Sequence, residues 1–232
     1  MALAGGQRRT PVDVRDAVGF QAAFGVSRET VERLTAFVET LRTWQKTLNL
    51  VSAGSLDVIW QRHVADSAQI LALAPSGSMK WVDLGSGGGF PGLVLAILLA
   101  EKGLARVILV ESDARKCAFL REVARKTGLS GSMSVDIVTG RIENPQIQSR
   151  VGTADVVTAR ALAPLEQLFG LARPLFHQET VGLFPKGRDA EREVDLARVA
   201  WEFEAELVDS VTDGAARVVV VRNLRALGVD RL

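Results

Sequence analysis

Apolar residues recur at three- and four-residue steps over the first third of the chain, which is the spacing of amphipathic helices. Ser27, a residue type that caps helices, precedes the clearest of these segments. A turn signal of Pro, Ser and Gly at residues 75–78 follows the last one. We therefore expect an N-terminal helical cap over residues 1–78. Its predicted helices cover residues 12–24, 28–48 and 55–73.

From residue 79 onward, short runs rich in Val, Ile and Leu alternate with helical patterns. This alternation is typical of a parallel sheet with crossover helices. The expected fold is therefore α/β and Rossmann-like, with a doubly wound, mostly parallel seven-stranded sheet in one domain over residues 79–232. The predicted strands cover residues 80–84, 106–111, 135–139, 155–159, 181–184, 202–210 and 217–222, and the predicted helices cover residues 91–101, 114–127 and 188–200.

The first predicted strand runs into a glycine-rich turn. Gly85, Gly87, Gly89 and Gly92 lie where this strand passes into the next helix. Glycine permits positive φ and lets a ligand approach the main chain, and the free amides of the helix point into the same crevice. A nucleotide-like ligand is the natural occupant of such a turn.

Two cofactor classes use a turn of this kind. The frame Gly87-x-Gly89-x-x-Gly92 satisfies the dinucleotide fingerprint, so an NAD-dependent oxidoreductase is one alternative. In the other frame, Asp83 stands two residues before Gly85. A carboxylate there repels a pyrophosphate but attracts the ammonium and sulfonium groups of S-adenosylmethionine (SAM). The sign of the charges favours SAM.

Further candidate residues stand where the other predicted strands end. Glu111 ends the second strand and can accept hydrogen bonds from the ribose hydroxyls of an adenosine cofactor. After the third strand, Ile142 and Glu143 offer an apolar contact and an acceptor to the adenine. Arg160 and Lys186 follow the fourth and fifth strands. The carboxyl ends of parallel strands form the ligand-binding edge of a sheet, so we expect both cations there.

Composition narrows the class of protein. The 232 residues are 47% hydrophobic and 24% charged, as in globular proteins. The net charge is +1, so a nucleic-acid partner requires a local basic patch. Cys117 is the single cysteine, which excludes an internal disulfide and fits a reducing cytoplasm. We expect no metal site, because His63 and His177 are isolated, and no membrane span, because no stretch reaches about 18 apolar residues.

Several short motifs occur in a fixed order along residues 30–190. They are Asn49-Leu50-Val51-Ser52, Arg62-His63-Val64-Ala65-Asp66-Ser67, Gly89-Phe90-Pro91-Gly92, Glu111 with Arg115-Lys116-Cys117-Ala118-Phe119-Leu120, Gly140-Arg141-Ile142-Glu143, Thr158-Ala159-Arg160-Ala161 and Lys186-Gly187. The ordered set resembles the ribosomal RNA small subunit methyltransferase G family. The resemblance implies a SAM-dependent methyltransferase fold and transfer of a methyl group from SAM to N7 of one guanine in 16S rRNA. It also implies the small ribosomal subunit or its RNA as partner, and we expect a cytoplasmic monomer.

The resemblance and the glycine turn together give a set of predicted cofactor contacts. By position in the family they fall on Gly85, Phe90, Ile142, Glu143 and Arg160; the turn adds Asp83 and Gly87, and the end of the second strand adds Glu111. Guanine N7 carries a free lone pair, so the reaction requires alignment and no general base. No catalytic residue is therefore assigned. A SAM-dependent methyltransferase of small molecules is a further alternative.

Three residues are predicted to contact RNA phosphates: Lys186, Arg62 and His63. Arg62 also stands four residues before Asp66 on the predicted helix 55–73. That spacing allows an ordinary Arg–Asp pair on a solvated face, which is the alternative reading of this segment.

Overall fold

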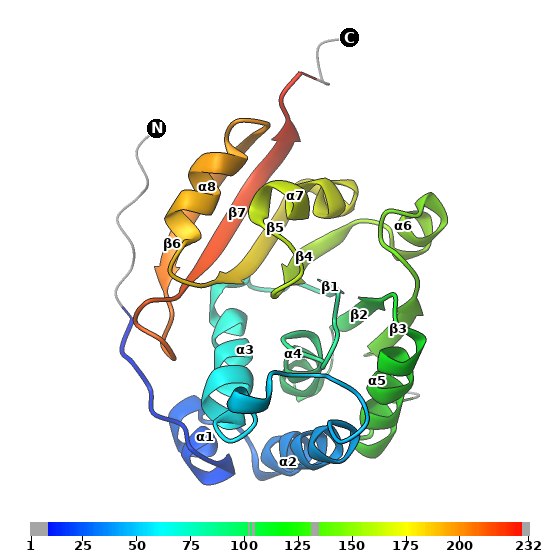
Figure 1. Ribbon diagram of the computed structural model, residues 1–232, viewed down its shortest axis with the longest axis vertical. Helices are drawn as coiled ribbons and strands as arrows, with labels where there is room; N and C mark the ends of the chain where they lie inside the picture. The colour runs from blue at the N-terminus through cyan, green and yellow to red at the C-terminus, as the bar shows by residue number, and fades with distance from the viewer. Residues whose placement is uncertain (1–8, 102, 104, 131–134, 229–232) are drawn as a thin grey trace.

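The computed structural model describes residues 9–101, 103, 105–130 and 135–228, and these form a seven-stranded sheet flanked by helices (Figure 1). The strand order is β3-β2-β1-β4-β5-β7-β6. Strands β1 to β5 are parallel, and β7 pairs antiparallel with both β5 and β6. The strands are β1 (Lys80–Leu84), β2 (Arg106–Glu111), β3 (Val135–Thr139), β4 (Ala154–Ala159), β5 (Phe176–Lys186), β6 (Trp201–Asp209) and β7 (Arg217–Ala226).

Helices cover both faces of the sheet, as the alternation of side chains along each strand requires. On β1, Trp81 points into one hydrophobic cluster and Val82 into the other. The first cluster contains side chains of α1 (Ala17–Phe24), α2 (Arg28–Trp44), α4 (Gly92–Ala100) and α5 (Ala114–Lys126). The second contains side chains of α6 (Pro145–Val151), α7 (Leu165–Ala172) and α8 (Ala190–Ala197). This three-layer arrangement confirms the predicted α/β fold.

The N-terminal helices follow the sequence signals at their caps. The Ser27 hydroxyl accepts a hydrogen bond from the Thr30 amide and begins α2 as expected. Asp16 caps α1 in the same way, so this helix begins at Ala17 and not at residue 12. The predicted helix over residues 55–73 is wrong as one α-helix. It divides into a 3-10 turn η1 (Ala53–Ser55), a π-helical segment η2 (Trp60–Ala65), a short α3 (Asp66–Ala68) and a 3-10 segment η3 (Gln69–Leu73).

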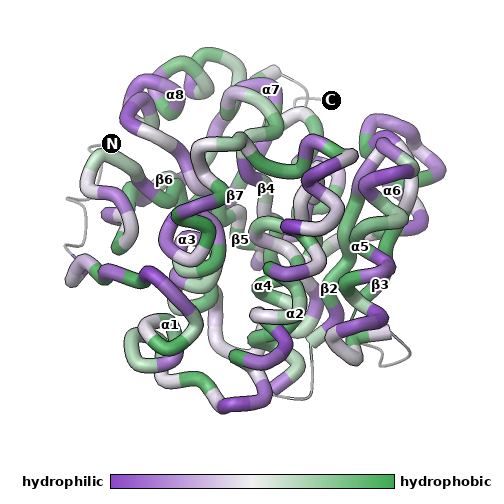
Figure 2. The backbone as a smooth tube through the Cα atoms, turned by 60° about the horizontal axis from the view of Figure 1, so that its bottom comes forward, coloured by the Kyte–Doolittle hydropathy of each residue, from purple (hydrophilic) through white to green (hydrophobic). Residues whose placement is uncertain are grey.

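Helix α4 lies at the centre of the layer that contains the N-terminal helices. Eight of its nine residues are buried, and Figure 2 shows it coloured as hydrophobic beside the more mixed α2. Phe37 and Leu41 of α2 belong to the same buried cluster as Leu93 and Ile97 of α4. The cap therefore packs on the sheet domain through a shared core, and a domain division at residue 78 remains a prediction. No helix in the described ranges is long and apolar enough to cross a membrane.

Two helices and parts of two strands were not expected from the sequence. Helices α6 and α7 are short, with seven and eight residues, so each offers few helical repeats. Strand β5 begins at Phe176, ahead of the expected start, because residues 177–179 are polar and exposed and do not resemble a buried strand. Strand β7 likewise continues to Ala226 past the expected end.

Candidate functional site

The glycine turn between β1 and α4 adopts a backbone that requires glycine. Gly85, Gly87 and Gly89 have φ angles of 65°, 50° and 86°, in the left-handed region that side chains disfavour. Glu111, at the end of β2, fixes the turn: its Oε2 accepts a hydrogen bond from the Gly87 amide at 2.9 Å. Its Oε1 accepts from the Asp113 amide at 2.8 Å. The carboxylate thus joins the turn to the N-terminus of α5.

A pocket of about 290 Å³ opens beside this turn, at the carboxyl ends of β1, β2 and β3. It lies where the strand order reverses around β1, which is the ligand-binding position of open α/β sheets. Five predicted cofactor residues line it: Gly85, Gly87, Glu111, Ile142 and Glu143. Its lining also includes Lys116, Arg141, Ala161 and Leu162. The structure therefore brings most of the predicted cofactor set to one place, and we call this space the turn pocket.

Asp83 lies outside the lining of the turn pocket. It is 1% exposed, and its Oδ1 accepts a hydrogen bond from the Thr158 hydroxyl at 2.7 Å. Its other oxygen, Oδ2, is buried without a hydrogen-bond partner, beside Gly92 at the start of α4. Burial raises the pKa of Asp83 to about 6, although the bond from Thr158 lowers it. Direct contact of Asp83 with a cofactor remains a prediction.

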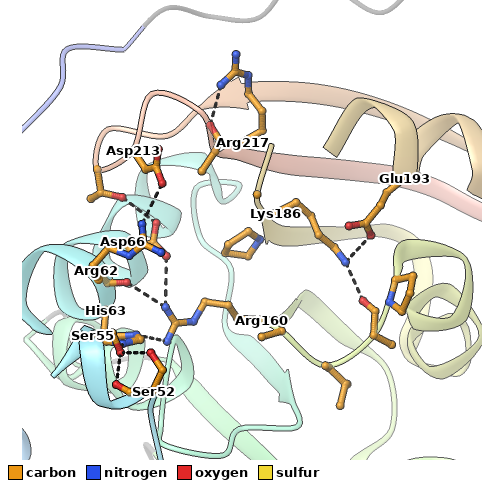
Figure 3. Close-up of a pocket in the computed structure, with 18 residues that line it drawn as sticks. Ser52, Ser55, Arg62, His63, Asp66, Arg160, Lys186, Glu193, Asp213 and Arg217 are labelled. Atoms are coloured by element: carbon orange, nitrogen blue, oxygen red, sulfur yellow. Dashed lines mark hydrogen bonds and ion pairs between the residues drawn. The ribbon is translucent and has the colours of Figure 1, made fainter. Parts of the chain in front are cut away.

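A second, larger pocket of about 580 Å³ adjoins the first, and we call it the polar pocket (Figure 3). The two pockets share Ala161 and Leu162 as lining residues. Its charged lining residues are Arg62, Asp66, Arg160, Lys186, Glu193, Asp213 and Arg217. The polar pocket is also lined by all three predicted RNA-binding residues, which are Arg62, His63 and Lys186.

Arg160 also lines the polar pocket, and its guanidinium points to the η2 side (Figure 3). It donates to His63 Nδ1 at 2.6 Å and to the Arg62 carbonyl at 3.1 Å, and it lies 3.5 Å from Asp66 Oδ2. Its side chain is 17% exposed. Three groups from the N-terminal segment thus hold this strand-end cation, together with the Phe90 ring, whose centroid lies 5.2 Å below it.

His63 is held as a neutral ring. Its Nδ1 accepts from Arg160, so Nε2 carries the proton and donates to the Ser55 hydroxyl at 2.8 Å. The Ser55 hydroxyl in turn donates to the Ser52 carbonyl. The ring stacks on Phe90 with a centroid distance of 4.8 Å. Burial, with the charges of Arg160 and Arg62, lowers the pKa of His63 to about 3.

Two further predicted residues have different partners from those that the sequence suggested. Arg62 forms an ion pair with Asp213 at 3.0 Å and not with Asp66, which lies beside Arg160. The Lys186 ammonium lies 2.7 Å from Glu193 Oε2 and donates to the Ala163 carbonyl at 2.8 Å. Phe90 is 5% exposed and underlies His63, outside the lining of the turn pocket.

The comparisons with known proteins agree with this geometry. A family model for rRNA small subunit methyltransferase G matches residues 30–221. The chain belongs to this family. The family's ribosomal RNA small subunit methyltransferase G from Parvibaculum lavamentivorans is 52% identical over 211 residues, which is 91% of each chain. The one from Rhodospirillum centenum is 46% identical over 222 residues, covering 96% of this chain and 97% of its own.

Solved structures show the same fold at low sequence identity. The cofactor-bound Rv0187 protein from MTB aligns with a TM-score of 0.57 at 16% identity, over 93% of this chain and 98% of its own. The O-methyltransferase from Bacillus cereus in complex with SAH aligns with a TM-score of 0.55 at 15% identity, over 82% and 91%. The fold is therefore that of Rossmann-like methyltransferases. Within the described residues, no group of three or more His, Cys, Asp or Glu side chains is arranged to hold a metal ion.

Several lining residues of the two pockets were not predicted as site residues, among them Asp66, Leu162 and Glu193. Asp66 belongs to the same motif as His63, three residues after it, so the sequence could have indicated its place beside the site. Leu162 follows Arg160 by two residues but reads as an ordinary apolar loop residue. Glu193 lies on α8, in a charged helix where one glutamate does not differ from the next.

Proposed function

We propose that this protein transfers a methyl group from SAM to N7 of one guanine in 16S rRNA. The observation that carries the proposal is the pair of adjoining pockets with Ala161 and Leu162 as their common wall. One pocket has the lining of an adenosine site, and the other is larger and bears several cations. Such a pair places a methyl donor beside the space for an acceptor base.

The turn pocket fits SAM by its chemistry. Gly85 and Gly87 line the pocket with positive φ, and a Cβ at Gly87 would meet no atom closer than 3.6 Å, so a ligand can approach the backbone there. Each Glu111 oxygen accepts one amide hydrogen bond and has a further lone pair for a ribose hydroxyl. Ile142 is apolar, and Glu143 can accept a bond from the adenine amino group. When bound, SAM supplies an electrophilic methyl group on a sulfonium.

The chain's own residues then have to orient the acceptor. Neutral guanine offers the N7 lone pair directly, so no side chain has to remove a proton. Alignment of the two reacting atoms at about 3–3.5 Å is the main contribution that a protein can make to such a transfer. The neutral state of His63 agrees with this chemistry, because both of its ring nitrogens serve to hold neighbouring groups.

For the RNA contacts, the geometry supports Arg62 most directly. Its side chain is 56% exposed and its partner Asp213 is 38% exposed, so solvent weakens this ion pair and a phosphate can compete for the guanidinium. His63 has no ring nitrogen free for a phosphate, and Lys186 is 9% exposed beside a carboxylate. We propose phosphate contact for Arg62 and a positioning role for His63.

The decisive test maps 7-methylguanosine in 16S rRNA from cells with and without the protein. We expect one modified guanine to disappear with the protein and to return when the gene is restored. Unchanged 7-methylguanosine in its absence would contradict the proposal and favour a small-molecule substrate. The cytoplasm is the proposed location, in agreement with the one cysteine, Cys117, being buried as a free thiol.

A variant series tests the RNA contact separately. Arg62→Gln should weaken RNA binding and reduce the slope of log affinity against log salt by about one, because one phosphate contact is lost. Arg28→Gln is the matched control, since Arg28 is 85% exposed on α2 and does not line the polar pocket. An equal effect of the two substitutions would show that general charge, and not Arg62, governs RNA binding.

A further inference from the structure

The segment that separates the two pockets, residues 161–164, is held in a strained conformation. Ala161 has φ of 53°, a left-handed conformation that residues other than glycine keep only where the surroundings enforce it. Its neighbour Leu162 lines both pockets and is 39% exposed. Its Cδ1 lies over Gly85, only 2.6 Å from where a Cβ on that glycine would stand. Leu162 is therefore the side chain between the space for the donor and the space for the acceptor.

Both ends of this segment are fixed by buried or half-buried polar groups. At its start, the neighbouring Arg160 is tied to His63 and to the Arg62 carbonyl. At its end, the Lys186 ammonium donates to the Ala163 carbonyl at 2.8 Å. Figure 3 shows the side chains of Arg160 and Lys186 pointing to opposite sides of the pocket. They act on the two ends of one short segment.

Glu193 completes the second anchor. Its Oε2 lies 2.7 Å from the Lys186 ammonium and accepts a hydrogen bond from the Leu165 amide at 2.9 Å. The same carboxylate thus binds the lysine and the first amide of α7. Lys186 is 9% and Glu193 25% exposed, so little solvent competes for these contacts. Together they hold a carbonyl and an amide on either side of Pro164.

We propose that Lys186 and Glu193 are positioning residues for methyl transfer, which hold the segment 161–164 so that Leu162 keeps the donor and acceptor pockets in register. This inference rests on the proposed function and assigns Lys186 a different part in it from phosphate contact. A lysine that is bonded to a carboxylate and a carbonyl presents little charge to RNA. Loss of the Lys186 side chain would displace Leu162 between the pockets, and a misplacement of about 1 Å in such a site lowers the rate about 100-fold.

The two roles for Lys186 predict opposite results for Glu193→Gln. If Lys186 gripped a phosphate, removal of the carboxylate charge would free the ammonium and tighten RNA binding. If the pair positions the wall, Glu193→Gln lowers kcat about ten- to 100-fold and leaves the KM for RNA and its salt dependence unchanged. Lys186→Met should likewise lower kcat and leave the KM for RNA unchanged. The kcat of the double variant should be no lower than that of the less active single variant.

The assay is methyl transfer from labelled SAM to small ribosomal subunits or 16S rRNA at several salt concentrations. Glu191→Gln is the matched control, because Glu191 is exposed on the same helix and loses the same charge. It should leave kcat unchanged. Leu162→Ala, which alters the wall without altering charge, should lower kcat with an unchanged KM for RNA. It keeps the test valid if Lys186→Met fails to fold.

The failures of the two proposals are distinct. A wild-type protein that transfers no methyl group to either RNA substrate overturns the proposed function, and the inference falls with it. An active wild type whose Glu193→Gln variant binds RNA more tightly, or whose Lys186→Met variant changes KM and the salt slope alone, overturns only the positioning role. Full activity of Leu162→Ala would likewise show that the wall does not set the alignment.

Discussion

The neutral His63 makes the stability of the protein depend on pH in a way that can be measured. In the folded protein, burial and two nearby arginines lower the pKa of His63 to about 3, against about 6.5 in an unfolded chain. Below pH 6.5 the unfolded state therefore binds a proton at His63 that the folded state does not bind. Stability is fully present above pH 6.5 and is lost as the pH falls from there toward 3.

The size of the effect follows from these two values. At pH 5 the solution lies about 1.5 units below the unfolded pKa, and each unit corresponds to about 1.4 kcal/mol. We expect protonation of His63 in the unfolded state to lower the free energy of unfolding by about 2 kcal/mol between pH 7 and pH 5. Asp83 acts in the opposite direction over the same range, so the wild-type curve alone does not isolate His63.

Urea unfolding of matched variants isolates it. His63→Gln keeps polar atoms near Arg160 and Ser55 but cannot titrate, so the unfolding free energy of wild type minus variant should fall by about 2 kcal/mol from pH 7 to pH 5. A wild-type-minus-His63→Gln difference that is constant within about 0.5 kcal/mol would refute the neutral, locked ring.

Three more predictions concern the glycine turn and the carboxylates near it. Burial raises the pKa of Asp83 to about 6, so its charged form destabilises the folded protein as the pH rises from about 4 to 7. In urea unfolding, the unfolding free energy of Asp83→Asn should therefore rise by about 2 kcal/mol relative to that of wild type over this pH range. Glu111→Gln removes an acceptor of charge-assisted hydrogen bonds worth about 1.5–3 kcal/mol, so calorimetry should show SAM bound at least about tenfold more weakly; an unchanged affinity would contradict the assigned contact. Gly87→Ala meets no atom closer than 3.6 Å, so only its φ of 50° opposes it, and it should lower the unfolding free energy by about 1–2 kcal/mol, whereas Gly54→Ala, in open space, should not.

Much of the fold was readable from the sequence because its signals are local. Strands β1, β2 and β3 have the predicted bounds, since each is a short run of β-branched or apolar residues between turn residues. The glycine turn and the acidic end of β2 also lie as expected, because φ above zero and the strand-end position are properties of single residues and their neighbours. Helices α6 and α7 were missed because so few residues show their period.

The sequence by itself determined the layered α/β fold, the place of the turn pocket and the family. Only the tertiary structure decided the partners of the charged side chains. Arg160 meets His63 across 97 positions of the chain, and Arg62 meets Asp213 across 151. Lys186 and Glu193 are seven apart, yet their pairing depends on how α8 turns back after β5. Period and propensity describe neighbours in the chain, whereas a buried charge is satisfied by whichever group the packed layers bring within about 3 Å.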